Sequence, residues 1–194
     1  MRMTGSDAPI GAVAFAALDF FVDAVELVPA ERWDAPSNLD EWTVRELVGH
    51  VTGSATKLAV LLEGGEAWLA PSEPTDWIRD DPAAELREIR GRIGRALPHA
   101  DLESPRPSPG GELPLHRALQ FPVADLALHA WDLHRSCGRT VELPEDLLKF
   151  CHSLIDSAPE EKMRRPGGFA PPTTPPEGAS ETQRLMAHLG REVG

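Results

Sequence analysis

Cysteine is scarce in this sequence of 194 residues, occurring only as Cys137 and Cys151. Two cysteines do not suggest a disulfide framework. Because no C-x-x-C pair occurs, a cysteine-based zinc site is not expected. The N-terminal stretch lacks a strongly basic leader and a good small-residue cleavage site, so we interpret it as part of a helix rather than as a signal peptide. No apolar run approaches membrane-spanning length. We therefore expect a soluble cytoplasmic protein that has no membrane partner.

Positive charge is also in deficit, with 19 Lys and Arg against 31 Asp and Glu and a net charge of −12. Nucleic acids and anionic membrane surfaces both require a basic footprint, so neither is an expected partner. A Gly-rich phosphate loop followed by Lys is absent, and so is G-x-S-x-G. Neither of these two kinds of site is therefore expected, and the sequence is compatible with a homodimer.

Strand-like alternation does not dominate anywhere, whereas apolar residues recur at helical spacing. Residues 98–114 are rich in Pro and Gly and predict a loop or short extended segments, and residues 164–179 predict a proline-stiffened extended segment. The predicted helices cover residues 10–28, 43–63, 81–97, 114 or 122 to about 135, 143–159 and 180–190. Helices joined by moderate loops predict an all-α bundle, which we treat as one domain over residues 1–194.

Capping signals mark the starts of three of these helices. Thr43 with Glu46 and Ser180 with Gln183 have capping-box spacing. Asp81 can cap the helix in which Pro82 takes the first position.

The fourth predicted helix contains ADLALHAWDLH, residues 124–134, in which acids and histidines interrupt an apolar run. Asp125 and His129 lie one turn apart on the same face. Burying a carboxylate costs several kcal/mol unless it is paired or coordinated. His50, on the inner flank of the second helix, can complete a metal site of two histidines and one carboxylate. The alternative is an Asp–His hydrogen bond that needs no metal.

The other polar residues of this stretch have different expected roles. Asp132 lies three residues after His129 and can orient its ring as a supporting carboxylate, or it can form a salt bridge with Arg135 or an arginine of another helix. His134 is expected either at the surface or at the helix end, where a histidine is favourable near the C-terminal dipole. Solvated surface positions are expected for His99 and His116, in or near the Pro/Gly segment, whereas His152 and His188 lie on peripheral predicted helices and have no expected functional role. No residue is assigned as a catalytic base.

Two long stretches, residues 38–64 and 109–139, resemble the ligand-bearing helices of the mycothiol-dependent maleylpyruvate isomerase-like proteins, within the DinB-like superfamily. The C-terminal residues 169–192 resemble the ending of a single-domain actinobacterial branch of that family. The resemblance implies an antiparallel four-helix bundle, here with an extra helix and an extended C-terminal segment. It implies a divalent metal held by His50, Asp125 and His129. Zinc is the usual metal, and nickel or iron also suit such ligands.

The resemblance also implies a function, in which mycothiol or a similar thiol is the cosubstrate. The metal would activate the thiol for S-transfer to a small electrophilic substrate, or for isomerisation of that substrate. Two departures weigh against maleylpyruvate isomerisation itself: the isomerase has Glu where this chain has Asp125, and it carries a further C-terminal domain with no expected counterpart here. The alternatives are a metal-binding bundle without catalysis and a metal-dependent lyase or hydrolase that uses no thiol.

Overall fold

The computed structural model describes residues 9–39, 41–108, 111–164 and 168–194. The chain divides into two compact units, a larger one, Ala8–Val141, and a smaller one that includes Glu142–Gly194. Among the described helices, none has the combined length and apolar character that crossing a membrane requires.

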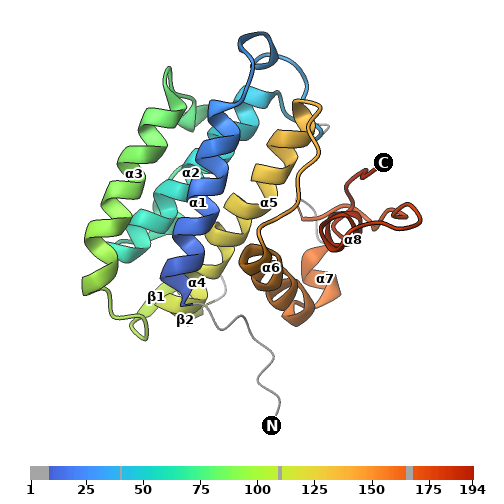
Figure 1. The fold of residues 1–194 in the computed structure, drawn as a ribbon. Coiled ribbons are helices and arrows are strands. Elements are labelled where there is room, and N and C mark those ends of the chain that lie inside the picture. The colour runs from blue at the N-terminus through green and yellow to red at the C-terminus, as the bar shows by residue number, and fades with distance from the viewer. Residues whose placement is uncertain (1–8, 40, 109–110, 165–167) are drawn as a thin grey trace. The chain divides into compact units, whose positions relative to one another are not determined.

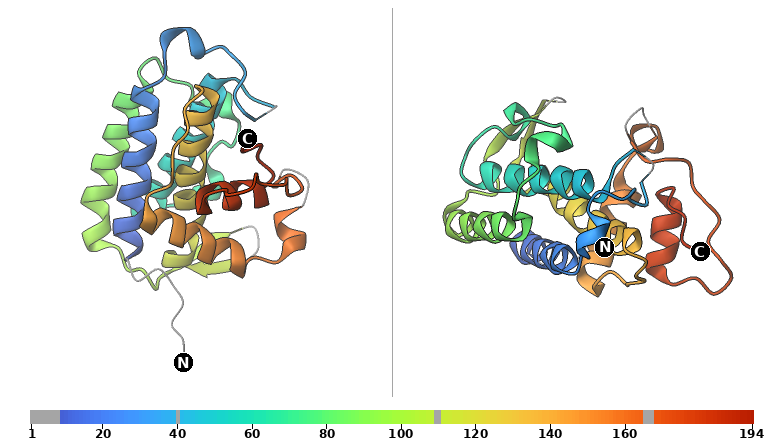
Figure 2. Two further views of the ribbon diagram at one scale, coloured as in Figure 1. Left: turned by 45° about the vertical axis from the view of Figure 1, so that its right-hand side comes forward. Right: turned by 90° about the horizontal axis from the view of Figure 1, so that it is seen from above.

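Four long helices form the larger unit: α1 (Ile10–Glu26), α2 (Val44–Leu62), α3 (Pro82–Ala96) and α5 (Gln120–Ser136). Helices α1 and α2 each pack against both α3 and α5, which closes a four-helix bundle (Figure 1). Helices α1 and α5 run in one direction and α2 and α3 in the other (Figure 2). Fully buried apolar side chains from all four helices fill the core, among them Phe21, Leu47, Ile93 and Trp131. The all-α bundle predicted from the sequence is confirmed.

The long return from α2 to α3 carries two short 3₁₀ helices, η2 (Ala67–Leu69) and η3 (Pro74–Trp77). A third, η1 (Ala30–Arg32), follows α1, and a fourth, η4 (Leu97–His99), extends α3. Helix η3 packs against α2. The close approach requires glycine on α2, because a Cβ at Gly49 would lie 2.4 Å from the carbonyl oxygen of Pro74.

The predicted helix starts are supported by their caps. Thr43 accepts a hydrogen bond from the Glu46 amide, and the Glu46 side chain accepts one from the Thr43 amide, which is a complete capping box. Ser180 and Gln183 form the second predicted box. Asp81 accepts from the Ala84 amide, directly before Pro82.

The fourth predicted helix is two helices in the structure. Helix α4 (Leu115–Ala118) is followed by a single turn residue, Leu119, and α5 begins at Gln120. Pro122 therefore lies within the first turn of α5, where a missing N–H costs no intrahelical bond. In the preceding Pro/Gly segment, β1 (Pro105–Ser108) and β2 (Gly111–Pro114) pair antiparallel, with Pro105 opposite Pro114. The short extended segments predicted there are thus the two strands of a hairpin.

The smaller unit contains α6 (Glu145–Ser157), α7 (Glu160–Met163) and α8 (Glu181–His188). Helix α6 packs against α8. The predicted extended segment is present where it is described: the Thr173 amide donates to the Ala187 carbonyl, and the Thr173 hydroxyl donates to the Arg191 carbonyl. Residues 165–167 of that segment lie outside the described residues. The four-residue helix α7 was not predicted.

Candidate metal centre

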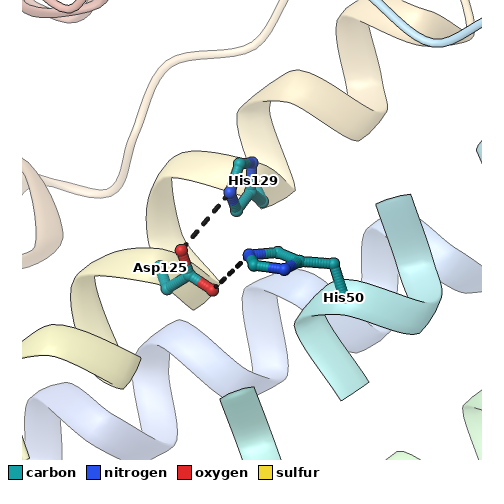
Figure 3. A group of neighbouring side chains, drawn as sticks. All are labelled: His50, Asp125 and His129. Atoms are coloured by element: carbon teal, nitrogen blue, oxygen red, sulfur yellow. Dashed lines mark ion pairs between the residues drawn. The ribbon is translucent and has the colours of Figure 1, made fainter. Parts of the chain in front are cut away.

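His50, Asp125 and His129 come together where α2 packs against α5, and their side chains point toward one another (Figure 3). The Nε2 atom of His50 lies 3.1 Å from Oδ2 of Asp125, and Nε2 of His129 lies 3.3 Å from Oδ1. One ligand atom from each residue falls within 4.8 Å of the other two. The three residues nominated from the sequence thus form one cluster.

Local structure sets the position of each side chain. The capping box fixes the start of α2 before Val44, and His50 follows two turns into that helix. On α5, residues from Leu126 to Leu133 are buried on all sides, as expected from the apolar sequence. Exposure of the side chains is 28% for Asp125, 26% for His50 and 11% for His129. The cluster is therefore partly accessible to solvent, at the edge of the contact between α2 and α5.

The contacts within the cluster shift the protonation of two members. Burial alone would raise the pKa of the Asp125 carboxyl, but the nearby His129 and hydrogen bonds to both histidines hold that pKa well below its usual value. Burial alone would lower the pKa of His129, yet the carboxylates of Asp125 and Asp132 raise it to about 9. Without a metal, an ionised Asp125 therefore faces a protonated His129 near neutral pH.

Asp132 lies where it can orient His129. Its Oδ2 is 2.8 Å from Nδ1 of His129, and its side chain is fully buried. A carboxylate that accepts a hydrogen bond from the Nδ1–H group leaves Nε2 free for a metal, which is the usual arrangement behind a ligand histidine. The Asn38 amide donates to the other oxygen, Oδ1 of Asp132, at 3.0 Å.

Two further residues touch the cluster, and the sequence reasoning did not single them out. Ser54, one turn after His50 on α2, donates a hydrogen bond to Oδ2 of Asp125. Its helical spacing from His50 was the signal that could have found it. The indole of Trp42 lies against the His50 ring with centroids 4.6 Å apart, and its centroid lies 6.2 Å from that of the His129 ring, to which it is steeply inclined. Trp42 precedes the helix, so no periodicity indicated this contact.

The donor atoms lie close enough together to be candidate ligands of a single metal ion. Ligand atoms bound at about 2.0–2.1 Å around a tetrahedral zinc lie roughly 3.3 Å from one another. In this cluster the two histidine nitrogens lie 3.1 and 3.3 Å from the two different oxygens of Asp125, and one ligand atom from each residue falls within 4.8 Å of the others. Two imidazole nitrogens and a carboxylate are also a donor set that suits zinc, nickel and iron.

His134 lies in the last turn of α5, which agrees with the helix-end alternative, and it is buried rather than at the surface. Arg139 folds back from beyond the helix and donates to Nδ1 of His134, whose ring also lies 5.7 Å from that of Phe20. Burial, together with Arg139, lowers the pKa of His134. Of the two histidines expected at solvated positions, His99 is exposed and His116 is partly buried. On the peripheral helices His188 is exposed and His152 is partly buried.

The larger unit is thus a four-helix bundle with a candidate metal centre of two histidines and one aspartate between two of its helices. The family model of the mycothiol maleylpyruvate isomerase N-terminal domain matches residues 14–134, and the chain belongs to that family. The match covers all four long helices apart from the ends of α1 and α5.

Similar proteins extend the comparison to both units. Two uncharacterized proteins from two strains of Mycobacterium tuberculosis are each 25% identical over 181 residues, which covers 91% of this chain and 94% of theirs. Crystal structures of the mycothiol-dependent maleylpyruvate isomerase and of a histidine-to-alanine mutant of it are 20% and 19% identical. Each has a TM-score of 0.61 and covers 76% of this chain and 70% of its own. These structures share the fold of this chain.

Proposed function

We propose that the protein is a divalent-metal-dependent enzyme that uses a small thiol, mycothiol or one like it, to act on a small electrophilic substrate. In the reaction the thiolate sulfur would form a bond to an electrophilic carbon of that substrate and so attach the whole thiol to it. If the thiol later leaves, the outcome would be isomerisation of the substrate. The observation that carries the proposal is the convergence of His50, Asp125 and His129. Membership of the mycothiol maleylpyruvate isomerase N-terminal domain family supports the choice of thiol.

In this proposal His50, Asp125 and His129 hold the metal, most readily zinc. A divalent metal supplies a positive charge that lowers the pKa of a coordinated thiol, so that a thiolate is present near neutral pH. Asp132 holds the His129 ring with Nε2 toward the site. Ser54 holds one oxygen of Asp125. The proposal places the protein in the cytoplasm, where small thiols stay reduced, without a nucleic-acid or membrane partner.

Metal content and thiol use test this proposal together. Protein expressed in zinc-supplemented medium is expected to carry about one equivalent of metal by mass spectrometry, and His50→Ala is expected to lose most of it. Consumption of mycothiol is then followed with a panel of electrophiles that includes maleylpyruvate. The expected result is consumption by the unaltered protein and a loss of at least roughly tenfold in His50→Ala, since each ligand is needed for a stable site.

The matched control is His99→Ala, which removes an exposed histidine outside the cluster and is expected to change neither metal content nor thiol consumption. Absence of bound metal would show that the cluster is an Asp–His ion pair. Metal without any reaction across the panel would favour a binding module. Turnover of an electrophile that does not require thiol would favour a lyase or hydrolase.

A further inference from the structure

We infer that Asn38 is a positioning residue for the candidate metal centre, and that it acts on His129 through Asp132. The inference rests on the metal site of the proposed function and adds a residue that lies far from Asp132 and His129 in sequence. Asn38 belongs to the loop before α2, whereas Asp132 and His129 belong to α5.

A chain of three side chains links the loop to the site. The Nδ2 amide of Asn38 donates to Oδ1 of Asp132 at 3.0 Å, and Oδ2 of Asp132 lies 2.8 Å from Nδ1 of His129. The side chain of Asp132 is fully buried. The Asn38 hydrogen bond fixes the rotation of the carboxylate, so that Oδ2 stays in line with the His129 ring. Without it, the carboxylate would lose one hydrogen bond in a buried setting and gain freedom to turn away.

The position of Asn38 is itself fixed by α5. Its backbone amide donates to the hydroxyl of Ser136 at 3.0 Å, and that hydroxyl also lies within hydrogen-bonding distance of Oδ1 of Asn38 and of the Asp132 carbonyl. Asn38 therefore contacts Ser136 and Asp132, which are one turn apart on α5. Hydrogen bonds to two residues of α5 hold the Asn38 side-chain amide in one position, which a single contact at the surface of a loop would not do.

The same loop reaches the second histidine of the site. The Ser37 amide donates to the Trp42 carbonyl at 2.9 Å, which ties the two ends of the loop together. Trp42 in turn lies against the ring of His50. Asn38 and Trp42 thus connect one loop to both candidate ligand histidines, and loosening Asn38 is expected to disturb His129 first.

Zinc affinity, measured by competition with a chromophoric chelator, tests the inference without any assay of activity. Asn38→Ala is expected to weaken zinc binding by about threefold to tenfold, below the roughly 10- to 100-fold loss expected for Asp132→Asn itself. Ser37→Ala is the matched control, because Ser37 hydrogen-bonds with Leu39 within the same loop. It is expected to change zinc affinity by less than about twofold.

A double-mutant cycle separates positioning from a general structural effect. If Asn38 acts through Asp132, adding Asn38→Ala to Asp132→Asn produces less than about a twofold further loss. Proton exchange at Nδ1 of His129, followed by nuclear magnetic resonance in the metal-free protein, is a second readout. Exchange is expected to be faster in Asn38→Ala than in Ser37→Ala. If Asn38→Ala does not fold, Asn38→Leu keeps about the same side-chain size and removes the donor without adding a charge beside Asp132, and it carries the same expectation.

Equal zinc affinity in Asn38→Ala and the unaltered protein would overturn the inference and leave the proposed function standing. An undiminished effect of Asn38→Ala in the Asp132→Asn background would also overturn it. If the unaltered protein binds no zinc, the proposed function fails, and with it the role of Asn38 at a metal site.

Discussion

Cys151 and Cys137 differ in their surroundings, and the difference determines their reactivity. Cys151 is buried in α6, and burial raises the pKa of its thiol to about 12. At pH 8 a thiol of that pKa is ionised to roughly one part in ten thousand, and the thiolate is the reactive form. Cys137 follows α5 and is partly exposed.

A chromogenic disulfide reagent at pH 8 is therefore expected to modify one thiol of the folded protein rapidly and the second only after unfolding. Cys137→Ser is expected to remove the fast phase. Rapid labelling of Cys151 in the folded protein would contradict the prediction. The same variant is the appropriate background for the thiol-consumption assay, because it removes the protein's own accessible thiol.

Residues that share a helix were the ones whose relative placement the sequence could predict. Asp125, His129 and Asp132 lie three or four residues apart, and helical geometry then fixes how they face one another. His50 was brought in by its place on an inner helix face, and the structure puts it beside them. Asn38 could not be found in this way, because its partner Asp132 is 94 positions distant. The metal-binding role of the cluster stays a prediction.

Helix α2 depends on a glycine where η3 packs against it. A Cβ at Gly49 would meet the backbone of Pro74 at 2.4 Å, and backbone cannot move aside as a side-chain tip can. Gly49→Ala is therefore expected to destabilise the protein by about 1–3 kcal/mol through overpacking. Urea unfolding of the metal-free protein measures this change.

Gly94→Ala on α3 provides the comparison, since Gly94 is exposed and its nearest neighbour, Phe15, would lie at an ordinary 3.7 Å. Here alanine is expected to stabilise by up to about 1 kcal/mol, because it is the better helix former. If Gly49→Ala stabilised the protein as Gly94→Ala is expected to do, the contact with η3 would not be the reason for a glycine at position 49.

The N-cap of α2 makes a separate contribution to the stability of the protein. Thr43→Ala removes the acceptor for the Glu46 amide and is expected to cost about 1 kcal/mol of unfolding free energy. Thr43→Ser keeps the hydroxyl and is expected to remain close to the unaltered protein. Thermal unfolding of the three proteins measures the difference, and equal destabilisation by Ser and Ala would rule out the cap as its cause.

Helices with strong periodicity and caps were predicted closely, as α2 and α3 show. The break between α4 and α5 was not, because the apolar pattern continues through Leu119 and only Pro114 and Pro122 suggested a boundary. The hairpin of β1 and β2 was predicted only as short extended segments, since its prolines and glycines carry no alternation. Helix α7 is too short for a periodic signal.

For the whole molecule, the single-domain organisation stays a prediction, while the chain forms two compact units. The family match, residues 14–134, falls within the larger unit. All candidate ligands and the residues that hold them, Asn38 and Asp132 included, belong to that unit as well. Metal binding is therefore expected to be linked to the stability of the larger unit.

The linkage between metal, protons and stability gives a prediction for the whole protein. In the metal-free protein the pKa of His129 is raised from 6.5 to about 9. The stabilisation from the protonated ring is then fully present below pH 6.5 and is lost as the pH rises through about 9. A metal must displace the same proton, so zinc affinity is expected to rise over this range. Free zinc at 100 times its dissociation constant adds about 2.7 kcal/mol to stability.

At fixed free zinc the stabilisation depends on zinc affinity, which increases with pH, so the zinc-induced rise in melting temperature is expected to be larger at pH 8.5 than at pH 6.5. Thermal unfolding at fixed free zinc, with and without the metal, measures the rise across this range. His129→Gln is expected to lose most of the rise and its dependence on pH, whereas His99→Gln, which alters an exposed histidine, keeps both. A zinc-induced rise that shrinks as the pH increases would mean that the metal does not compete with the proton of His129, and the ligand set would then have to exclude that residue.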